Sequence, residues 1–190
     1  MTLLGRLLRN RRSGATHLAW NLPNLQGPEQ LAVTSAHFGD GETMPRETGA
    51  KNIGGDNLSP QLSWTAPPSG TVQLLLVVED IDVPMAKPAV HCVALIDPAA
   101  GELGAGALAA RRPAAGVRVL RATIGRGYHG PGPIKGHGPH RYVFQLFALG
   151  APLDEAAGTV PVDRARPRTL LPAVTAPVLA RGRLTGVYER

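Results

Sequence analysis

The chain has 190 residues, enough for one domain with a sizeable core, and 43% of them are hydrophobic. Its 23 glycines and 18 prolines exceed average usage and argue against long helices. A single cysteine, Cys92, excludes a disulfide framework within the chain. Cysteine usage of this kind is typical of a reducing compartment, so we expect a cytoplasmic protein.

The positive charge is concentrated at the start of the chain. Of a formal net charge of +6, four charges come from Arg6, Arg9, Arg11 and Arg12, and the remainder is almost balanced. The sequence contains no nucleic-acid-binding motif and no interleaving of basic and aromatic residues. We therefore expect no nucleic-acid partner.

Residues 1–25 are predicted to form a basic amphipathic N-terminal arm, ahead of a domain over residues 26–190. Leucines 3, 4, 7 and 8 would form one apolar stripe on a helix. Arginines interrupt the apolar run, so we expect that it is not a secretory signal. Three alternatives stay open: a helix packed on the domain or on a second copy in a homodimer, a frayed end, or peripheral contact with an anionic membrane surface. The membrane contact would use Leu3, Leu4, Leu7, Arg6, Arg9, Arg11 and Arg12.

The remaining elements are mostly short strands. Strands are predicted at 31–38, within 54–70, at 73–80, at 90–97 and at 141–150, with a fragment in 117–123 and a last strand through 183–189. Segment 166–182 predicts a short or kinked helix, because Pro172 and Pro177 restrict it. The fold class is mainly β.

Two strand ends carry polar residues with potential chemistry. Asp80 and Asp82 follow the 73–80 run, and strict alternation would place both on one face. His91 would share a face with Val93, with Cys92 pointing the opposite way as a small buried hydrophobe. The plain alternatives are a solvated strand end and a satisfied core histidine.

The stretch GPGPIKGHGPHRY at 130–142 has a more specific pattern. His140 and Tyr142, two residues apart at a strand start, can face one cavity. Gly136 and Gly138 permit backbone conformations closed to other residues and let amide groups point inward. Imidazole, phenol and free amides suit an anion the size of phosphate or a carboxylate, although a turn without a ligand remains open.

These motifs together resemble the phosphatidylethanolamine-binding protein family, which includes the Raf-kinase inhibitor proteins and bacterial relatives. DNLSPQLSW (56–64), EDIDVP (79–84), His91 and GYHGPGPIKGHGPHRYVFQLFAL (127–149) occur in the family's order, and the likeness covers residues 30–190. It implies Greek-key antiparallel β-sheets with a short C-terminal helix beside a small anion pocket, and no metal or organic cofactor. The pocket residues carried over are Asp80, Asp82, His91, Pro131, Gly132, Pro133, His140 and Tyr142.

The chain departs from the family pattern at three positions. Ile81 replaces the central proline of the aspartate turn, Cys92 replaces a tryptophan, and Ile134 stands where a second pocket proline is common. We therefore expect anion binding to be weaker or differently selective.

From the residues we expect a non-catalytic binding or regulatory protein for phosphate or a phosphoryl head group such as phosphoethanolamine. His91 and His140 would donate hydrogen bonds, most strongly when protonated, with Tyr142 and a glycine amide as neutral donors. Asp80 or Asp82 would orient a histidine, because a carboxylate would repel the anion. A hydrolase or zinc site built from these residues is the alternative, with Ser59 expected to be structural, and a protein partner stays open.

Overall fold

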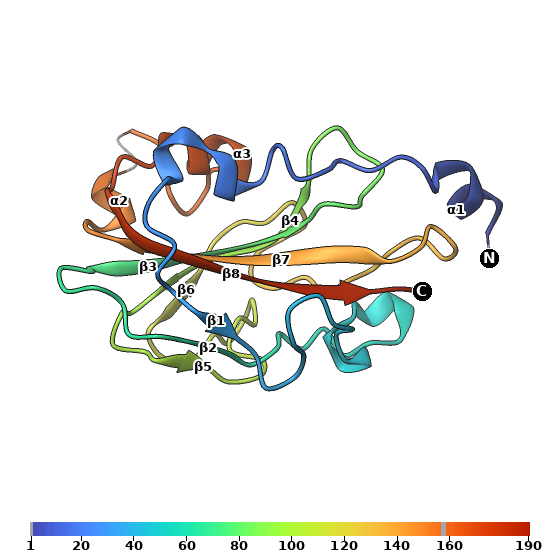
Figure 1. Cartoon of the computed structure of the whole chain (residues 1–190), viewed down its shortest axis with the longest axis horizontal. Coiled ribbons are helices and arrows are strands. Elements are labelled where there is room, and N and C mark those ends of the chain that lie inside the picture. The colour runs from blue at the N-terminus through green and yellow to red at the C-terminus, as the bar shows by residue number, and fades with distance from the viewer. Residues whose placement is uncertain (1, 157–158) are drawn as a thin grey trace.

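The computed structural model describes residues 2–156 and 159–190, and it contains two antiparallel sheets (Figure 1). A five-stranded sheet has the order β6-β4-β3-β7-β8, and a three-stranded sheet has the order β1-β2-β5. The strands are β1 (Val33–Thr34), β2 (Leu62–Trp64), β3 (Gln73–Asp80), β4 (Ala89–Ile96), β5 (Glu102–Leu103), β6 (Val117–Val119), β7 (His140–Leu149) and β8 (Val178–Tyr188). The predicted mainly β fold of Greek-key antiparallel sheets is confirmed.

The helices of the described residues are short. They are α1 (Leu3–Leu8), α2 (Leu153–Ala156) and α3 (Pro167–Leu170), with single 3-10 turns at Ala19–Asn21, Pro23–Leu25, Arg46–Thr48, Lys51–Ile53 and Leu171–Ala173. The short helix predicted from the prolines is therefore present as α3 and the turn after it. Among the described residues, no helix is both long and apolar enough to cross a bilayer.

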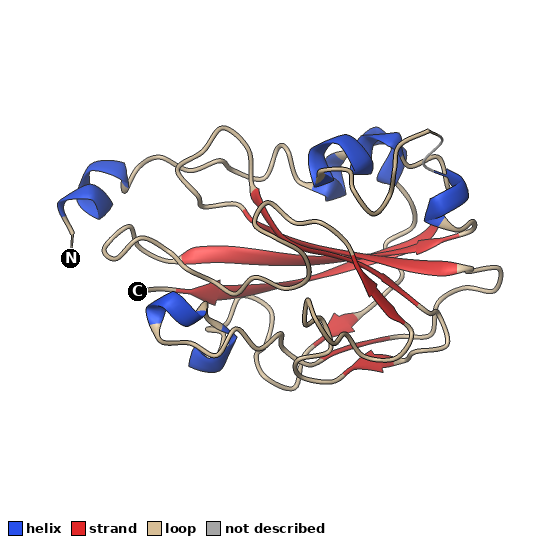
Figure 2. Cartoon of the chain, turned by 180° about the vertical axis from the view of Figure 1, so that it is seen from behind, coloured by secondary structure: helices blue, strands red, loops and turns tan. Residues whose placement is uncertain are grey.

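The five-stranded sheet is buried on both faces. Leu74, Leu76 and Val78 of β3 pack between the two sheets, whereas Leu75 and Val77 pack in a second core on the opposite face. Figure 2 shows the small sheet on one side of the large sheet and most of the helical turns on the other. Burial on both faces explains why β3 is a continuous apolar run rather than an alternating one.

Two predicted strands have different lengths in the structure. The strand expected at 31–38 is reduced to β1, because the Ser35 hydroxyl accepts a hydrogen bond from the His37 amide and turns the chain. The last strand begins earlier than expected, at Val178, directly after Pro177.

A β-bulge in β4 changes which way its side chains point. Val78 pairs with Cys92 and Glu79 pairs with Val90, so His91 is an extra residue without a partner in β3. As a result Val90 and Cys92 lie in different cores, and His91 contacts Tyr142 of the inter-sheet core. The prediction that His91 shares the face of Val93 is wrong, because strict alternation fails at a bulge.

The arm runs from α1, at the end of the molecule where both termini lie, along one edge to the helical turns near α3 (Figure 1). The Gly14 amide donates to the Ile81 carbonyl (2.9 Å), and the Ala19 amide donates to the buried Glu79 carboxylate (2.6 Å). Arg168 of α3 pairs with the same carboxylate at 2.6 Å. Desolvation nonetheless raises the Glu79 pKa, with Arg168 opposing that shift. The arm is thus tied to the sheet through a buried acid next to Asp80.

Candidate anion-binding site

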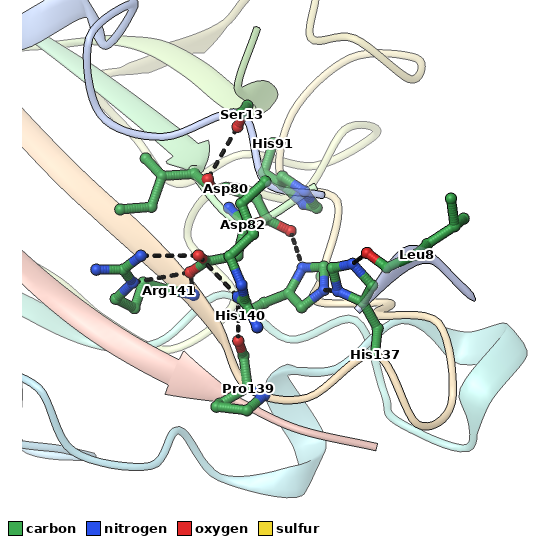
Figure 3. Close-up of polar contacts among 12 residues, drawn as sticks. Leu8, Ser13, Asp80, Asp82, His91, His137, Pro139, His140 and Arg141 are labelled. Atoms are coloured by element: carbon green, nitrogen blue, oxygen red, sulfur yellow. Dashed lines mark hydrogen bonds and ion pairs between the residues drawn. The ribbon is translucent and has the colours of Figure 1, made fainter. Parts of the chain in front are cut away.

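Three strand segments bring the predicted site residues together at one end of the large sheet. In the antiparallel register, Asp80 at the end of β3 lies between Ala89 of β4 and Tyr142 of β7. The bulged His91 and the strand-start His140 therefore lie on either side of the β3 end, and Figure 3 shows them in one cluster with Asp80. The imidazoles of His91 and His140 both contact the Tyr142 ring, with centroid distances of 5.1 and 6.5 Å.

His140 is held by two buried partners. Its Nδ1 lies 2.8 Å from Asp80 Oδ2, and its Nε2 lies 2.7 Å from His137 Nδ1. Asp80 is therefore the aspartate that orients a histidine, as expected for one of the pair. Because both ring nitrogens are occupied, His140 has no free donor for a ligand in this conformation, and its donation to an anion stays a prediction.

His137 is a member of the cluster that the sequence analysis did not select. Its side chain is fully buried, and its Nε2 lies 2.7 Å from the Leu8 carbonyl oxygen. Gly136 and Gly138, at φ +87° and +99°, turn the loop so that the ring between them points back at His140. The sequence feature that could have identified His137 is its position between two glycines, three residues before His140.

His91 is neutral and offers an acceptor. Its Nδ1 lies 2.7 Å from the His129 carbonyl oxygen, which only accepts, so Nδ1 carries the proton and Nε2 the lone pair. Burial lowers the pKa of His91, and the Asp80 charge opposes this shift. His91 therefore donates to a ligand only once it is protonated, whereas the sequence predicted a donor that is merely strongest when protonated.

The Tyr142 hydroxyl is buried and unpaired. No donor or acceptor among the described residues meets hydrogen-bond geometry with it, although Asp80 and the Gly132 amide lie close enough to affect its pKa. Burial first, and then the Asp80 charge, raise that pKa, so the phenol stays a neutral O–H donor. Buried polar groups are normally satisfied, so an unpaired one invites a ligand.

Asp82 does not join this cluster. The chain turns after Asp80, whose Oδ1 accepts from the Asp82 amide, so the two carboxylates do not act on one face as predicted. Asp82 instead accepts from Arg141 at 2.7 and 2.8 Å and pairs with Arg12 at 2.8 Å. Burial alone would raise its pKa, but the hydrogen bonds from the two arginines prevail and lower it to about 2.

The loop at 131–133 borders the site through its glycine. The Gly132 amide is near the Tyr142 hydroxyl, in line with the predicted glycine donor. The Pro131 carbonyl accepts from the Ala50 amide at 2.7 Å, which fixes the loop to a neighbouring segment. The role of Pro131 and of the buried Pro133 in a pocket wall stays a prediction.

Two residues considered for nucleophilic chemistry are structural. Cys92 is fully buried, and burial raises its thiol pKa to about 12. The buried Ser59 hydroxyl accepts from the Leu108 amide at 3.3 Å. Cys92 is thus the small buried residue that was predicted, and the Ser59 hydroxyl has a structural role, as expected, through a long-range contact rather than a turn or cap.

Comparison with known proteins places this geometry in a family. A sequence model described as phosphatidylethanolamine-binding protein matches residues 34–189. The UPF0098 protein Rv1910c of Mycobacterium tuberculosis is 33% identical over 178 residues, which is 92% of this chain and 78% of that protein.

Two solved structures have the same architecture. The Escherichia coli protein YbcL, described as a member of the mammalian PEBP family, superposes with a TM-score of 0.70 at 28% identity over 85% of this chain and 99% of that one. The homologue CT736 from Chlamydia trachomatis gives a TM-score of 0.69 at 26% identity, with the same shares of the two chains. The matching sequence model, these relatives and the shared fold show that this chain belongs to the phosphatidylethanolamine-binding protein family.

Proposed function

We propose that this protein is a non-catalytic binding protein for a small anion, either phosphate or a phosphoryl head group such as phosphoethanolamine. The observation that carries the proposal is the buried Tyr142 hydroxyl without a hydrogen-bond partner among the described residues. It lies beside the Gly132 amide and next to the ring of His91, whose Nε2 has no partner in the described part of the chain.

The donors and acceptors of this site match a protonated oxyanion. Tyr142 O–H and the Gly132 amide donate, whereas neutral His91 accepts at Nε2. A phosphate or phosphomonoester that keeps one P–OH group offers both acceptor oxygens and a donor. Sulfate at neutral pH carries no proton and would face the His91 lone pair with an oxygen.

The expected affinity is modest. A hydrogen bond to a charged group contributes about 1.5–3 kcal/mol. Two or three such bonds, less the cost of ordering the ligand, give micromolar to millimolar dissociation constants.

A binding role is favoured over hydrolysis by the state of the reactive groups. The Cys92 thiol stays protonated, the Ser59 hydroxyl is used by the backbone, and both ring nitrogens of His140 are occupied. Nucleophilic catalysis needs a nucleophile within reach of a free base.

We also propose that the protein is cytoplasmic and that a protein partner binds differently to its anion-bound and anion-free forms.

Calorimetric titration with phosphate tests this function. Phosphate should bind the full chain at pH 6, several-fold more weakly at pH 8, and more weakly again in His140→Ala, because its loss frees the buried Asp80 carboxylate to repel the anion. Sulfate should bind at least tenfold more weakly than phosphate at pH 7. The exposed His17 provides the control, His17→Ala, which should match the unaltered protein. Phosphate binding that is independent of pH and unchanged by His140→Ala would contradict the proposal.

A further inference from the structure

The N-terminal arm closes over the histidine cluster at several points. The Thr2 hydroxyl donates to the Lys135 carbonyl at 2.8 Å, and the Leu8 carbonyl oxygen lies 2.7 Å from His137 Nε2. Arg12 then contacts both Asp82 and the Pro139 carbonyl at 2.8 Å. Figure 3 shows Leu8 at the outer end of a row that continues through His137 and His140 to Asp80.

This row of contacts fixes the number of protons in it. The Leu8 carbonyl only accepts, so His137 Nε2 must carry a proton, and ionised Asp80 only accepts, so His140 Nδ1 must carry another. The central contact joins two ring nitrogens at 2.7 Å and needs one proton, because two would clash and none would leave two lone pairs facing each other. Two neutral imidazoles hold two protons, whereas the row needs three.

The count is the same for every distribution of the protons. If Asp80 takes one, each imidazole is neutral and the three contacts are again filled. The closed row therefore always holds one proton more than an ionised carboxylate and two neutral imidazoles. All three side chains are at least 97% buried, so water does not substitute for a missing proton.

We propose that His137 is a further residue of the site and that the arm is a proton-dependent strap, which closes only while His137, His140 and Asp80 together hold one proton more than two neutral imidazoles and an ionised carboxylate. When that proton is lost, the contact to Leu8 fails first, because it joins the buried row to an exposed segment. A second extra proton would place two N–H groups face to face and would also break the row. Closure is thus greatest at intermediate pH.

Charged and titratable groups from several elements surround the pair. Asp80 contacts the pair directly and offsets its positive charge. The Arg12 guanidinium is paired with Asp82. Burial, together with the neighbouring His129 and His140, lowers the pKa of His91 and keeps its ring neutral. The titratable and charged groups that face the pair or its loop come from every element packed against it. They are Asp80 of β3, His91 of β4, Tyr142 of β7, Tyr188 of β8, Arg11 and Arg12 of the arm, Lys135, and Arg190, with the Arg11 carbonyl 3.2 Å from His137 Nε2 and the Arg190 carbonyl accepting from the Gly136 amide.

The strap regulates the proposed anion site, and this step rests on the proposed function. In this proposal His137 Nε2–H is a donor that the open protein adds to the Tyr142 hydroxyl and the Gly132 amide, and in the closed arm this donor is bonded to the Leu8 carbonyl oxygen instead. Arm and anion therefore compete for one donor, and the arm acts as an internal substitute for the ligand. Because closure takes up one proton, the ratio of closed to open arm should fall as the pH rises and the open row loses that proton. An anion that accepts from His137 Nε2 needs the same proton, so phosphate binding should weaken over the same pH range.

Gly5 gives a way to open the strap without altering the site. Gly5 is buried against the loop that carries His137, and a Cβ at this position would lie 2.4 Å from the Lys135 carbonyl oxygen. Gly5→Ala should therefore unseat the arm while favouring the α1 helix itself. Leu7→Ala is the matched control on the same helix, because the Leu7 side chain is 72% exposed.

An NMR titration of the full ¹⁵N-labelled chain from pH 5 to 9, without phosphate, tests the strap. The amides of residues 6–12 should shift with the same midpoint as the His137 ring in the unaltered chain and in Leu7→Ala. In Gly5→Ala that shared transition should disappear from the arm amides. Arm amides that stay constant while the ring titrates would overturn the proposal. Thr2→Val, which removes the hydroxyl that donates to the Lys135 carbonyl and caps α1 by accepting from the Gly5 amide, is a milder variant should Gly5→Ala fail to fold.

Phosphate binding separates this inference from the proposed function. If both hold, Gly5→Ala should bind phosphate several-fold more tightly than Leu7→Ala. If phosphate binds neither variant, but the arm amides of the unaltered chain and of Leu7→Ala still shift together with the His137 ring, the proposed anion function is refuted and the strap is supported. If phosphate binds both variants equally, the competition between arm and anion is refuted.

Discussion

At the scale of single residues, the feature that distinguishes the histidine cluster from an ordinary buried polar network is the Tyr142 hydroxyl. His137, His140 and Asp80 satisfy one another and the arm, so they resemble any buried polar network. The Tyr142 hydroxyl instead remains unpaired among the described residues although the ring is almost fully buried. Trp64 Nε1 and Arg181 Nε are also buried without a partner among the described residues, so it is the place of the Tyr142 hydroxyl beside His91 and the Gly132 amide that supports the proposed ligand contact.

Tyr142→Phe should therefore separate binding from stability. Removing an unpaired buried hydroxyl should leave the free energy of unfolding unchanged or raise it by up to about 1 kcal/mol, because no hydrogen bond is lost. The phosphate dissociation constant should increase about tenfold, since a donor to the anion is lost. Urea unfolding and calorimetry on the same preparation measure both. A variant that is clearly less stable yet binds phosphate normally would show that the hydroxyl is structural.

At the scale of elements, Asp82 joins three parts of the chain. It follows β3, accepts from Arg141 in β7 and pairs with Arg12 of the arm. The sequence indicated an acidic strand end, but the turn that separates Asp82 from Asp80 depends on one side-chain hydrogen bond to the backbone. Sequence alternation alone did not reveal that turn.

Asp82→Asn should destabilise the fold in a pH-dependent way. The folded-state pKa of about 2 lies below the ordinary value of 3.8, so the carboxylate stabilises the fold above about pH 4 and loses this contribution as the pH falls toward 2. We expect a loss of about 2 kcal/mol in the free energy of unfolding at pH 7, and a much smaller difference from the unaltered protein at pH 2.5. The exposed Asp56 supplies the control, Asp56→Asn, which should change stability by less than about 0.5 kcal/mol. An equal loss at both pH values would show that the ion pairs are not the cause.

The long strands were the most predictable elements. Their apolar runs are continuous, and burial on both faces of the sheet explains why period-two alternation was not needed to find them. The bulge at His91 was not predictable, because it depends on the register between β3 and β4. The position of His91 next to Tyr142 rests on that single extra residue.

At the scale of the whole molecule, the site exists because distant segments meet at one end of the sheet. His137 and the Leu8 carbonyl are 129 positions apart in the sequence, and no local pattern predicts their contact. The basic charge and leucines of the arm were visible in the sequence, and the structure leaves Leu3, Leu4 and Leu7 exposed. Contact of this surface with a membrane or with a second copy stays a prediction, as does the boundary between the arm and the domain.

The most direct measurement is a crystal structure of the full chain soaked with phosphate at pH 6. The account predicts tetrahedral density within hydrogen-bond distance of the Tyr142 hydroxyl and His91 Nε2, with the arm displaced from His137. Phosphate bound only elsewhere on the protein, with the Tyr142 hydroxyl still unpaired at saturating phosphate, would contradict it.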